Sequence, residues 1–306
     1  MQNKSMKQKT IGGSFTVEGV ALHTGLHIKL TALPAPAGHG IIIKRVDLEG
    51  MPTIEAIADN VGYTVRGTVL KNQDLQVSTI EHAMAAFHAV GIDNCVFEVD
   101  GPEFPILDGS AGIYRDKIQE VGIVEQDADK EFLVIDEIIE YKTESGSMIT
   151  AYPSDKYELE VMIGFDSPVL SEQTAILEDI SEFNAKTATA RTFVFVREIE
   201  QLLELNLIKG GDLKNAIVIY DRIMSQEAVN NLCEKLHQAP IDASQLGYLN
   251  GGLKFENEPA MHKLLDVVGD LALVGRPIKG KIVAKFPGHK INTEFAKILR
   301  DKYITI

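Results

Sequence analysis

The spacing of apolar and polar residues predicts strands in both halves of the chain. Residues 27–33 carry apolar side chains at every second position, which is typical of a strand with one buried face. Residues 41–43 form a short apolar run after a stretch that prolines and glycines break. Residues 159–163 alternate like the first segment, and residues 281–286 lie between a glycine and a proline. We therefore expect a set of strands in each half.

Two helices are predicted between these strands. The first begins at Ser78, where Ser-Thr-Ile-Glu matches a capping box, and runs to about Val90. The second opens around Asn257, has Pro259 at a favourable early position, and ends at Gly275. Because the second helix is apolar on most sides, we expect it to be buried.

The two halves are similar in pattern and are separated by a polar linker, residues 125–131. In each half a helix is followed by a glycine, a short strand and a turn. We predict an α+β fold of two similar domains, residues 1–124 and 131–306, each a β-sheet layered with helices.

The composition is that of an ordinary folded protein. Of 306 residues, 45% are hydrophobic and 24% are charged, and the formal net charge is −14. These values exclude disordered, collagen-like and coiled-coil classes. The acidic balance argues against a nucleic-acid partner, because phosphate binding relies on clustered Lys and Arg. An anionic substrate would need a local basic pocket.

Cysteine content and apolar segments bear on the compartment. Cys95 and Cys233 are the only cysteines, too few for a disulfide framework. We expect no signal peptide, because no apolar stretch follows the charged N-terminal residues, and no stretch of the sequence approaches the ~18 apolar residues of a membrane helix. We expect a cytoplasmic protein without an integral membrane segment.

Polar residues form one stripe on the second helix. His262, Asp266 and Asp270 recur at i, i+4 and i+8, so they share a face of a helix that is otherwise apolar. One interpretation is a His–Asp ion pair with a solvated Asp270. The apolar neighbours favour a second interpretation, a metal site, because burying ionisable groups without partners is costly.

The first helix adds Glu81 and His82. Adjacent helical residues point about 100° apart, so these two cannot easily bind one ion side by side. His82 is a candidate ligand, and Glu81 a candidate base aimed at a water molecule. Alternatively, Glu81 is only the glutamate of the capping box.

Together, His82, His262 and Asp266 would form a site of two histidines and one carboxylate. Catalytic zinc sites and non-haem iron oxygenases both use such ligands, so ligand type does not decide the chemistry. Glu81 favours hydrolysis, because a hydrolase needs a base beside the water. His289, in a loop just after a strand, is a second candidate for proton transfer.

With these motifs in place, the sequence resembles the UDP-3-O-acyl-N-acetylglucosamine deacetylases, the zinc amidases that commit the pathway to lipid A. The matching segments keep the family's order and span almost the whole chain. They are Gly19-Val20-Ala21-Leu22-His23-Thr24-Gly25, Ser78-Thr79-Ile80-Glu81-His82, Gly91-Ile92-Asp93-Asn94, Pro105-Ile106-Leu107-Asp108-Gly109-Ser110-Ala111, Ala190-Arg191-Thr192-Phe193, His262-Lys263-Leu264-Leu265-Asp266, Gly269-Asp270-Leu271 and Gly288-His289.

The resemblance implies an active site between the two domains. It matches His82, His262 and Asp266 to the zinc ligands, with Fe²⁺ an alternative native metal. It matches Glu81 to the general base. Thr192 and His289 match groups that stabilise the oxyanion of the tetrahedral intermediate. Asp270 would orient His289, and Lys263 matches a substrate-binding lysine.

The resemblance also implies a hydrophobic passage for the substrate's acyl chain, built by an insertion at about 192–221. Periodicity alone would favour an amphipathic helix followed by a strand, and both can hold. Leu22, Phe193 and Ile199 are expected to contribute to substrate binding in the passage, and Phe165 is a candidate for stacking on the uracil.

Two positions depart from the family pattern. Phe286 stands where many members carry a basic residue, and Lys285 beside it is not an obvious replacement because neighbours on a strand face opposite sides. Val194 stands where some relatives have glycine, which would narrow the passage.

We therefore predict a zinc-dependent hydrolase that removes acetate from a UDP-linked, 3-O-acylated N-acetylglucosamine and acts as a monomer. Two other hypotheses stay open: an iron-dependent oxygenase that uses the same triad, and a noncatalytic binder of nucleotide-linked lipids. Some relatives carry a second lipid-pathway domain after the segment that resembles this chain.

Overall fold

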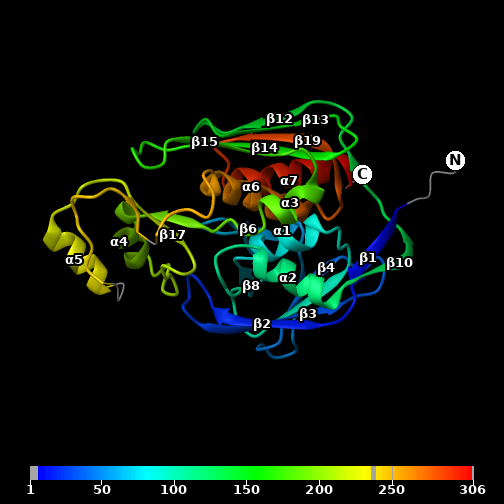
Figure 1. Ribbon diagram of the computed structural model, residues 1–306. Helices are drawn as coiled ribbons and strands as arrows, with labels where there is room; N and C mark the ends of the chain where they lie inside the picture. The colour runs from blue at the N-terminus through cyan, green and yellow to red at the C-terminus, as the bar shows by residue number, and fades with distance from the viewer. Residues whose placement is uncertain (1–5, 236–238, 250, 305–306) are drawn as a thin grey trace.

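Two β-sheets form the outer layers of the protein and helices fill the space between them (Figure 1). The computed structural model describes residues 6–235, 239–249 and 251–304. The first sheet has the order β2 (Phe15–Val20), β3 (His27–Pro34), β9 (Cys95–Val99), β4 (Ile41–Arg45), β5 (Thr53–Glu55). The second has the order β12 (Ile139–Lys142), β13 (Met148–Tyr152), β19 (Ile278–Lys285), β14 (Tyr157–Gly164), β15 (Glu172–Leu177), with β11 (Leu133–Val134) paired to β19.

The two sheets have the same topology. Read across each sheet in that order, the four pairings are antiparallel, antiparallel, parallel and antiparallel. In each unit one helix precedes the central strand and another follows it. The prediction of an α+β fold with two similar units is therefore confirmed.

The inner layers are α1 (Glu81–Ala89) and α2 (Gly112–Val121) on the first sheet, and α6 (Glu258–Leu271) and α7 (His289–Tyr303) on the second (Figure 1). The contact between α1 and α6 is close because Gly269 has no side chain: a Cβ there would lie 2.1 Å from the backbone oxygen of Glu81. This approach brings the polar stripe of α6 against the start of α1.

Shorter elements complete the two units. β6 (Val61–Tyr63), β7 (Val69–Asn72) and β8 (Leu75–Ser78) form a small sheet that leads into α1. The short helices are η1 (Ala58–Asn60), η2 (Ile180–Glu182), α3 (Phe183–Lys186) and η3 (Ala272–Val274). The predicted polar linker is instead mostly strand, because β10 (Ile123–Asp129) pairs with β1 (Lys7–Ile11).

The insertion projects to one side of the layered body (Figure 1). It contains β16 (Phe193–Phe195), α4 (Val196–Glu204), β17 (Ile217–Tyr220), α5 (Gln226–Lys235) and β18 (Gly247–Tyr248). Its three strands form a separate sheet. Phe195, Ile217 and Ile219 join the main core, and other apolar side chains of the insertion form a separate cluster. The insertion is therefore longer than the predicted 192–221, because β18 returns to pair with β17.

The predicted strands are confirmed as β3, β4, β14 and β19, and the second helix as α6 with η3. The predicted start of the first helix, at Ser78, was wrong. Ser78 ends β8, and its hydroxyl donates to Pro102 O rather than capping a helix, so α1 begins at Glu81. Within the described residues, no helix has the length and apolar character needed to cross a membrane.

Candidate metal centre

Three potential metal ligands meet where α1 contacts α6. His82, His262 and Asp266 are all buried, and their donor atoms lie within 4.8 Å of one another. Asp266 Oδ1 is 3.4 Å from His262 Nε2 and 4.0 Å from His82 Nε2. The i, i+4 spacing places two of them on one face of α6, and the α1–α6 contact supplies the third.

The protonation states of these groups fit a divalent cation. Burial lowers the pKa of His82 to about 3 and also lowers the pKa of His262, so both rings are neutral at pH 7. Burial opposes the charge on Asp266, but Lys263 and the nearby histidines hold the pKa of that carboxyl well below its usual range. Neutral imidazoles and an ionised carboxylate are the forms that bind a metal.

Hydrogen bonding also suits a metal. His262 Nδ1 lies 3.0 Å from Ala190 O, so Nδ1 donates and Nε2 is free to act as a ligand. Asp266 Oδ1 is buried and has no hydrogen-bond partner among the residues that the structure describes. Buried polar atoms nearly always have a hydrogen-bonding or ionic partner, and a bound cation would be a suitable partner for this oxygen.

Glu81 lies beside the three ligands at the first turn of α1. Its side chain is buried, and its Oε2 accepts a hydrogen bond from Thr68 N at 3.2 Å. Burial raises the pKa of Glu81 to about 7. A carboxyl group with such a pKa exchanges protons readily near neutrality, as a general base must.

His289 faces Glu81 from the start of α7. Its Nε2 is 3.8 Å from Glu81 Oε1 and 3.9 Å from Asp266 Oδ2, and its Nδ1 is 2.9 Å from Asp270 Oδ2. Burial would disfavour the imidazolium, but Asp270, Asp266 and Glu81 together raise the pKa of His289 to about 9. The ring is therefore a cation at neutral pH, and Nε2 presents its proton to the centre.

Asp270 is fixed by two side chains that the sequence analysis missed. Thr68 Oγ1 donates to Asp270 Oδ1 at 2.5 Å, and Asn292 Nδ2 donates to Asp270 Oδ2 at 2.9 Å. Asn292 is one turn after His289 on α7, so that spacing was a usable signal. Thr68 is distant in sequence from Asp270, and no sequence pattern linked the two residues.

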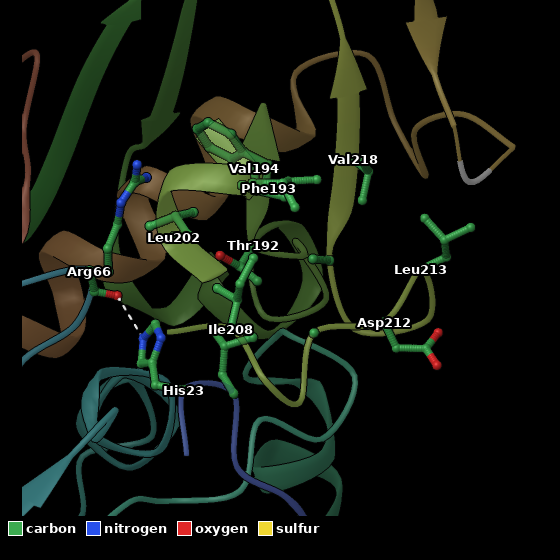
Figure 2. Close-up of a pocket in the computed structure, with 14 residues that line it drawn as sticks. His23, Arg66, Thr192, Phe193, Val194, Leu202, Ile208, Asp212, Leu213 and Val218 are labelled. Atoms are coloured by element: carbon green, nitrogen blue, oxygen red, sulfur yellow. Dashed lines mark hydrogen bonds between the residues drawn. The ribbon is translucent and has the colours of Figure 1, made fainter. Parts of the chain in front are cut away.

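A polar cleft and an apolar passage meet at the centre. The cleft, of about 110 Å³, is lined by Glu81, the three ligands and His289 among others. The passage, of about 90 Å³, runs into the insertion and is lined by side chains such as Val194, Leu202, Ile208, Leu213 and Val218 (Figure 2). Four residues line both spaces: Leu22, Arg66, Thr192 and Phe193. The two spaces are therefore contiguous.

The other predicted substrate residues are placed as follows. Ile199 lines the passage, and so does Val194. Lys263 lines the cleft, where its Nζ is 2.8 Å from Asp266 Oδ2 and 5.5 Å from the centroid of the Phe193 ring. Phe165 lines neither space but packs edge-on against Phe193, with centroids 5.7 Å apart.

The departure at Phe286 is local to the end of β19. Phe286 has a φ of 52°, and its ring lies over Gly164, where a Cβ would approach the ring to 2.8 Å. Neither Phe286 nor Lys285 lines the cleft. The cation at the junction of cleft and passage is instead Arg66, which the sequence analysis missed and whose Nη2 is 2.9 Å from Glu198 Oε2.

A further missed residue, Glu103, connects the passage to α1. Its buried carboxylate accepts from His23 N at 2.9 Å, Thr24 N at 2.8 Å and Thr79 Oγ1 at 3.0 Å. Thr79 has a φ of 59°, an unusual backbone conformation that places Glu81 at the start of the helix. Glu103 thereby holds the loop that carries Leu22 against the entry to α1.

The fold and these groups define the class of site. Two histidines and one aspartate form a candidate metal centre with a carboxylate and an imidazolium beside it, a combination that suits metal-assisted hydrolysis. Residues 8–234 and 235–301 match the family described as UDP-3-O-acyl N-acetylglycosamine deacetylase. The chain belongs to this family.

Several curated relatives are similar over nearly the whole chain. The "Bifunctional enzyme LpxC/FabZ" of Bacteroides thetaiotaomicron is 54% identical over 96% of this chain, and that of Porphyromonas gingivalis is 52% identical over 96%. The chain spans 64% of the length of each of these two relatives. The "UDP-3-O-acyl-N-acetylglucosamine deacetylase" of Myxococcus xanthus is 36% identical over 98% of this chain and 89% of its own length.

Proposed function

We propose that this protein is a zinc-dependent deacetylase that releases acetate from a UDP-linked, 3-O-acylated N-acetylglucosamine. The observation that carries the proposal is the junction of the two spaces at the metal centre. A polar cleft with titratable groups suits an amide bond next to a sugar, and an apolar passage suits an acyl chain on the same sugar. The four residues that line both the cleft and the passage join these two spaces into one continuous site.

His82, His262 and Asp266 would hold the metal. A bound Zn²⁺ would supply Lewis-acid chemistry, polarising the amide carbonyl and acidifying a water molecule. Hydrolysis is proposed over oxygenation because a base adjoins the ligands: Glu81 has no evident task in an oxygenase, whereas hydrolysis requires it.

The protein's own groups then divide the proton transfers. Glu81, with its pKa raised to about 7 by burial, accepts the proton of the attacking water. Attack at the acetyl carbon places a negative charge on the former carbonyl oxygen. This oxyanion is stabilised by the His289 imidazolium and by the Thr192 hydroxyl. His289 is also placed to protonate the leaving amine, so that the C–N bond breaks to acetate and a free amino sugar.

Binding of the anionic end of the substrate depends on local charge. The chain has a formal net charge of −14, so its overall field repels a nucleotide diphosphate. Lys263 and Arg66 bring positive charge to the cleft. The acyl chain would lie in the passage, where each buried methylene contributes about 0.8 kcal/mol.

The direct test is acetate release from a synthetic UDP-3-O-acyl-N-acetylglucosamine, measured with and without a chelator. We expect turnover that a chelator abolishes and that added Zn²⁺ restores. Turnover that survives complete removal of metal, or no acetate release by the zinc-loaded protein, would contradict the proposal. Metal analysis of protein purified without oxygen would distinguish zinc from iron.

The Asp270–His289 pair predicts a pH effect. Asp270 raises the pKa of His289 in the folded protein, so the active imidazolium is lost only as pH rises through that raised pKa. Replacing Asp270 with Asn keeps the size of the side chain but removes the charge. We expect the alkaline limit of kcat to move down by about 1–2 pH units. A pH–rate profile checks this, and an unchanged alkaline limit would show that Asp270 does not act through His289.

A further inference from the structure

The apolar passage borders a second cavity inside the insertion, which we call the distal chamber. Ile199, Leu213 and Val218 line both spaces. None of the four residues shared by the passage and the metal cleft lines the distal chamber. Cleft, passage and chamber therefore follow one another in that order. Figure 2 shows Leu213 and Val218 at the side of the passage that lies away from His23 and Arg66.

The walls of the distal chamber are apolar and come from every helix of the insertion. α4 contributes Val196 and Ile199, and α5 contributes Val229, Leu232 and Cys233. Among the described residues that line it, the one hydroxyl group is satisfied elsewhere: Tyr220 Oη donates to Ala243 O and accepts from Met224 N, both at 2.9 Å. Such a cavity gives water no partners, so it favours an apolar occupant.

The size of the distal chamber suits the end of an alkyl chain. Its volume is about 40 Å³, and one water-sized group needs roughly 10–15 Å³ in such a measure. It therefore has room for about three methyl-sized groups. Protein interiors are normally packed without spaces of this size, so a chamber beside the passage is a feature that a ligand would complete.

We propose that the distal chamber receives the terminal carbons of the substrate's acyl chain and sets the longest chain that the enzyme accepts. Leu213 lines the boundary between passage and chamber, which the acyl chain would cross. Cys233 on α5 would limit how far the end of the acyl chain extends into the chamber. This inference rests on the proposed function, because it assumes that an acyl chain occupies the passage. It assigns to α5 a role in substrate selection that the passage alone does not require.

The test compares kcat/KM for acetate release across substrates with acyl chains of increasing length. Cys233→Phe fills the chamber, Leu213→Ala opens its wall, and Asn230→Phe places the same ring on the exposed side of α5 as a matched control. We expect Cys233→Phe to shorten the longest accepted chain and to leave the shortest substrates within twofold. Each methylene that loses its place should lower kcat/KM by about fourfold. Leu213→Ala should lengthen the limit, and Asn230→Phe should change nothing.

An unchanged length profile in both Cys233→Phe and Leu213→Ala would overturn the proposal, as would an equal loss at every length. If Cys233→Phe does not fold, Leu213→Ala decides by the direction of its shift. If no substrate releases acetate, the proposed function fails. Calorimetry with fatty acids of the same lengths then tests the chamber alone, because Cys233→Phe should weaken binding only of the longer acids.

Discussion

Replacing Glu81 with Gln is expected to lower kcat for acetate release by roughly 10²–10⁴-fold, the usual contribution of a general base. The amide keeps the shape of the side chain and can still accept the hydrogen bond from Thr68 N. It cannot accept a proton from water. Since Glu81 does not belong to the group of three ligand residues, the metal content should stay at the wild-type value, as measured on the purified protein.

Two comparisons make this result specific. Glu98→Gln changes a carboxylate of the same kind on β9, where it pairs with Lys44 and lines neither the cleft nor the passage, and should leave kcat unchanged. If the protein were a noncatalytic binder and Glu81 only stabilised the start of α1, Glu81→Ala would lower the free energy of unfolding with no turnover to lose. Urea unfolding checks that alternative. Glu81→Gln protein that retains wild-type kcat would remove Glu81 from the mechanism.

Much of this arrangement was predictable from local sequence pattern. Alternation indicated β3 and β14 because each buries one face of its sheet, and the burial of successive residues alternates accordingly. The i, i+4 stripe on α6 identified His262 and Asp266 because helical geometry alone places them together. What joined His82 to them was the resemblance and the general chemistry of metal sites, not any pattern within α1.

The failures share a physical cause, which is that partners distant in sequence decided the outcome. Ser78 and Glu81 match a capping box, but Ser78 is held in β8 by pairing with Val69, so no cap can form. The polar residues of the expected linker pair with β1, which lies more than a hundred residues earlier near the N-terminus. Thr68 and Glu103 matter because they reach Asp270 and the loop at Leu22, contacts that only the folded chain creates.

The three proposed metal ligands also predict a coupling between metal binding and stability. Asp266 carries a buried negative charge whose Oδ1 has no hydrogen-bond partner in the described residues, and His82 and His262 are buried and neutral. A cation that binds this set only in the folded state stabilises the protein, by about 4 kcal/mol at a thousandfold excess over Kd. The midpoint of thermal unfolding should therefore rise with metal and fall with a chelator.

Replacing His262 with Ala should abolish both acetate release and this metal-dependent stabilisation. The substitution removes the Nε2 ligand 3.4 Å from Asp266 Oδ1 and leaves two of three protein ligands. Three are needed for a catalytic zinc site. The stability readout does not depend on activity: the unfolding midpoint of His262→Ala should be the same with zinc and with chelator, whatever its absolute value. His27→Ala, on the exposed start of β3, should keep the wild-type response. A His262→Ala protein that retains one zinc ion and full activity would show that the metal centre lies elsewhere.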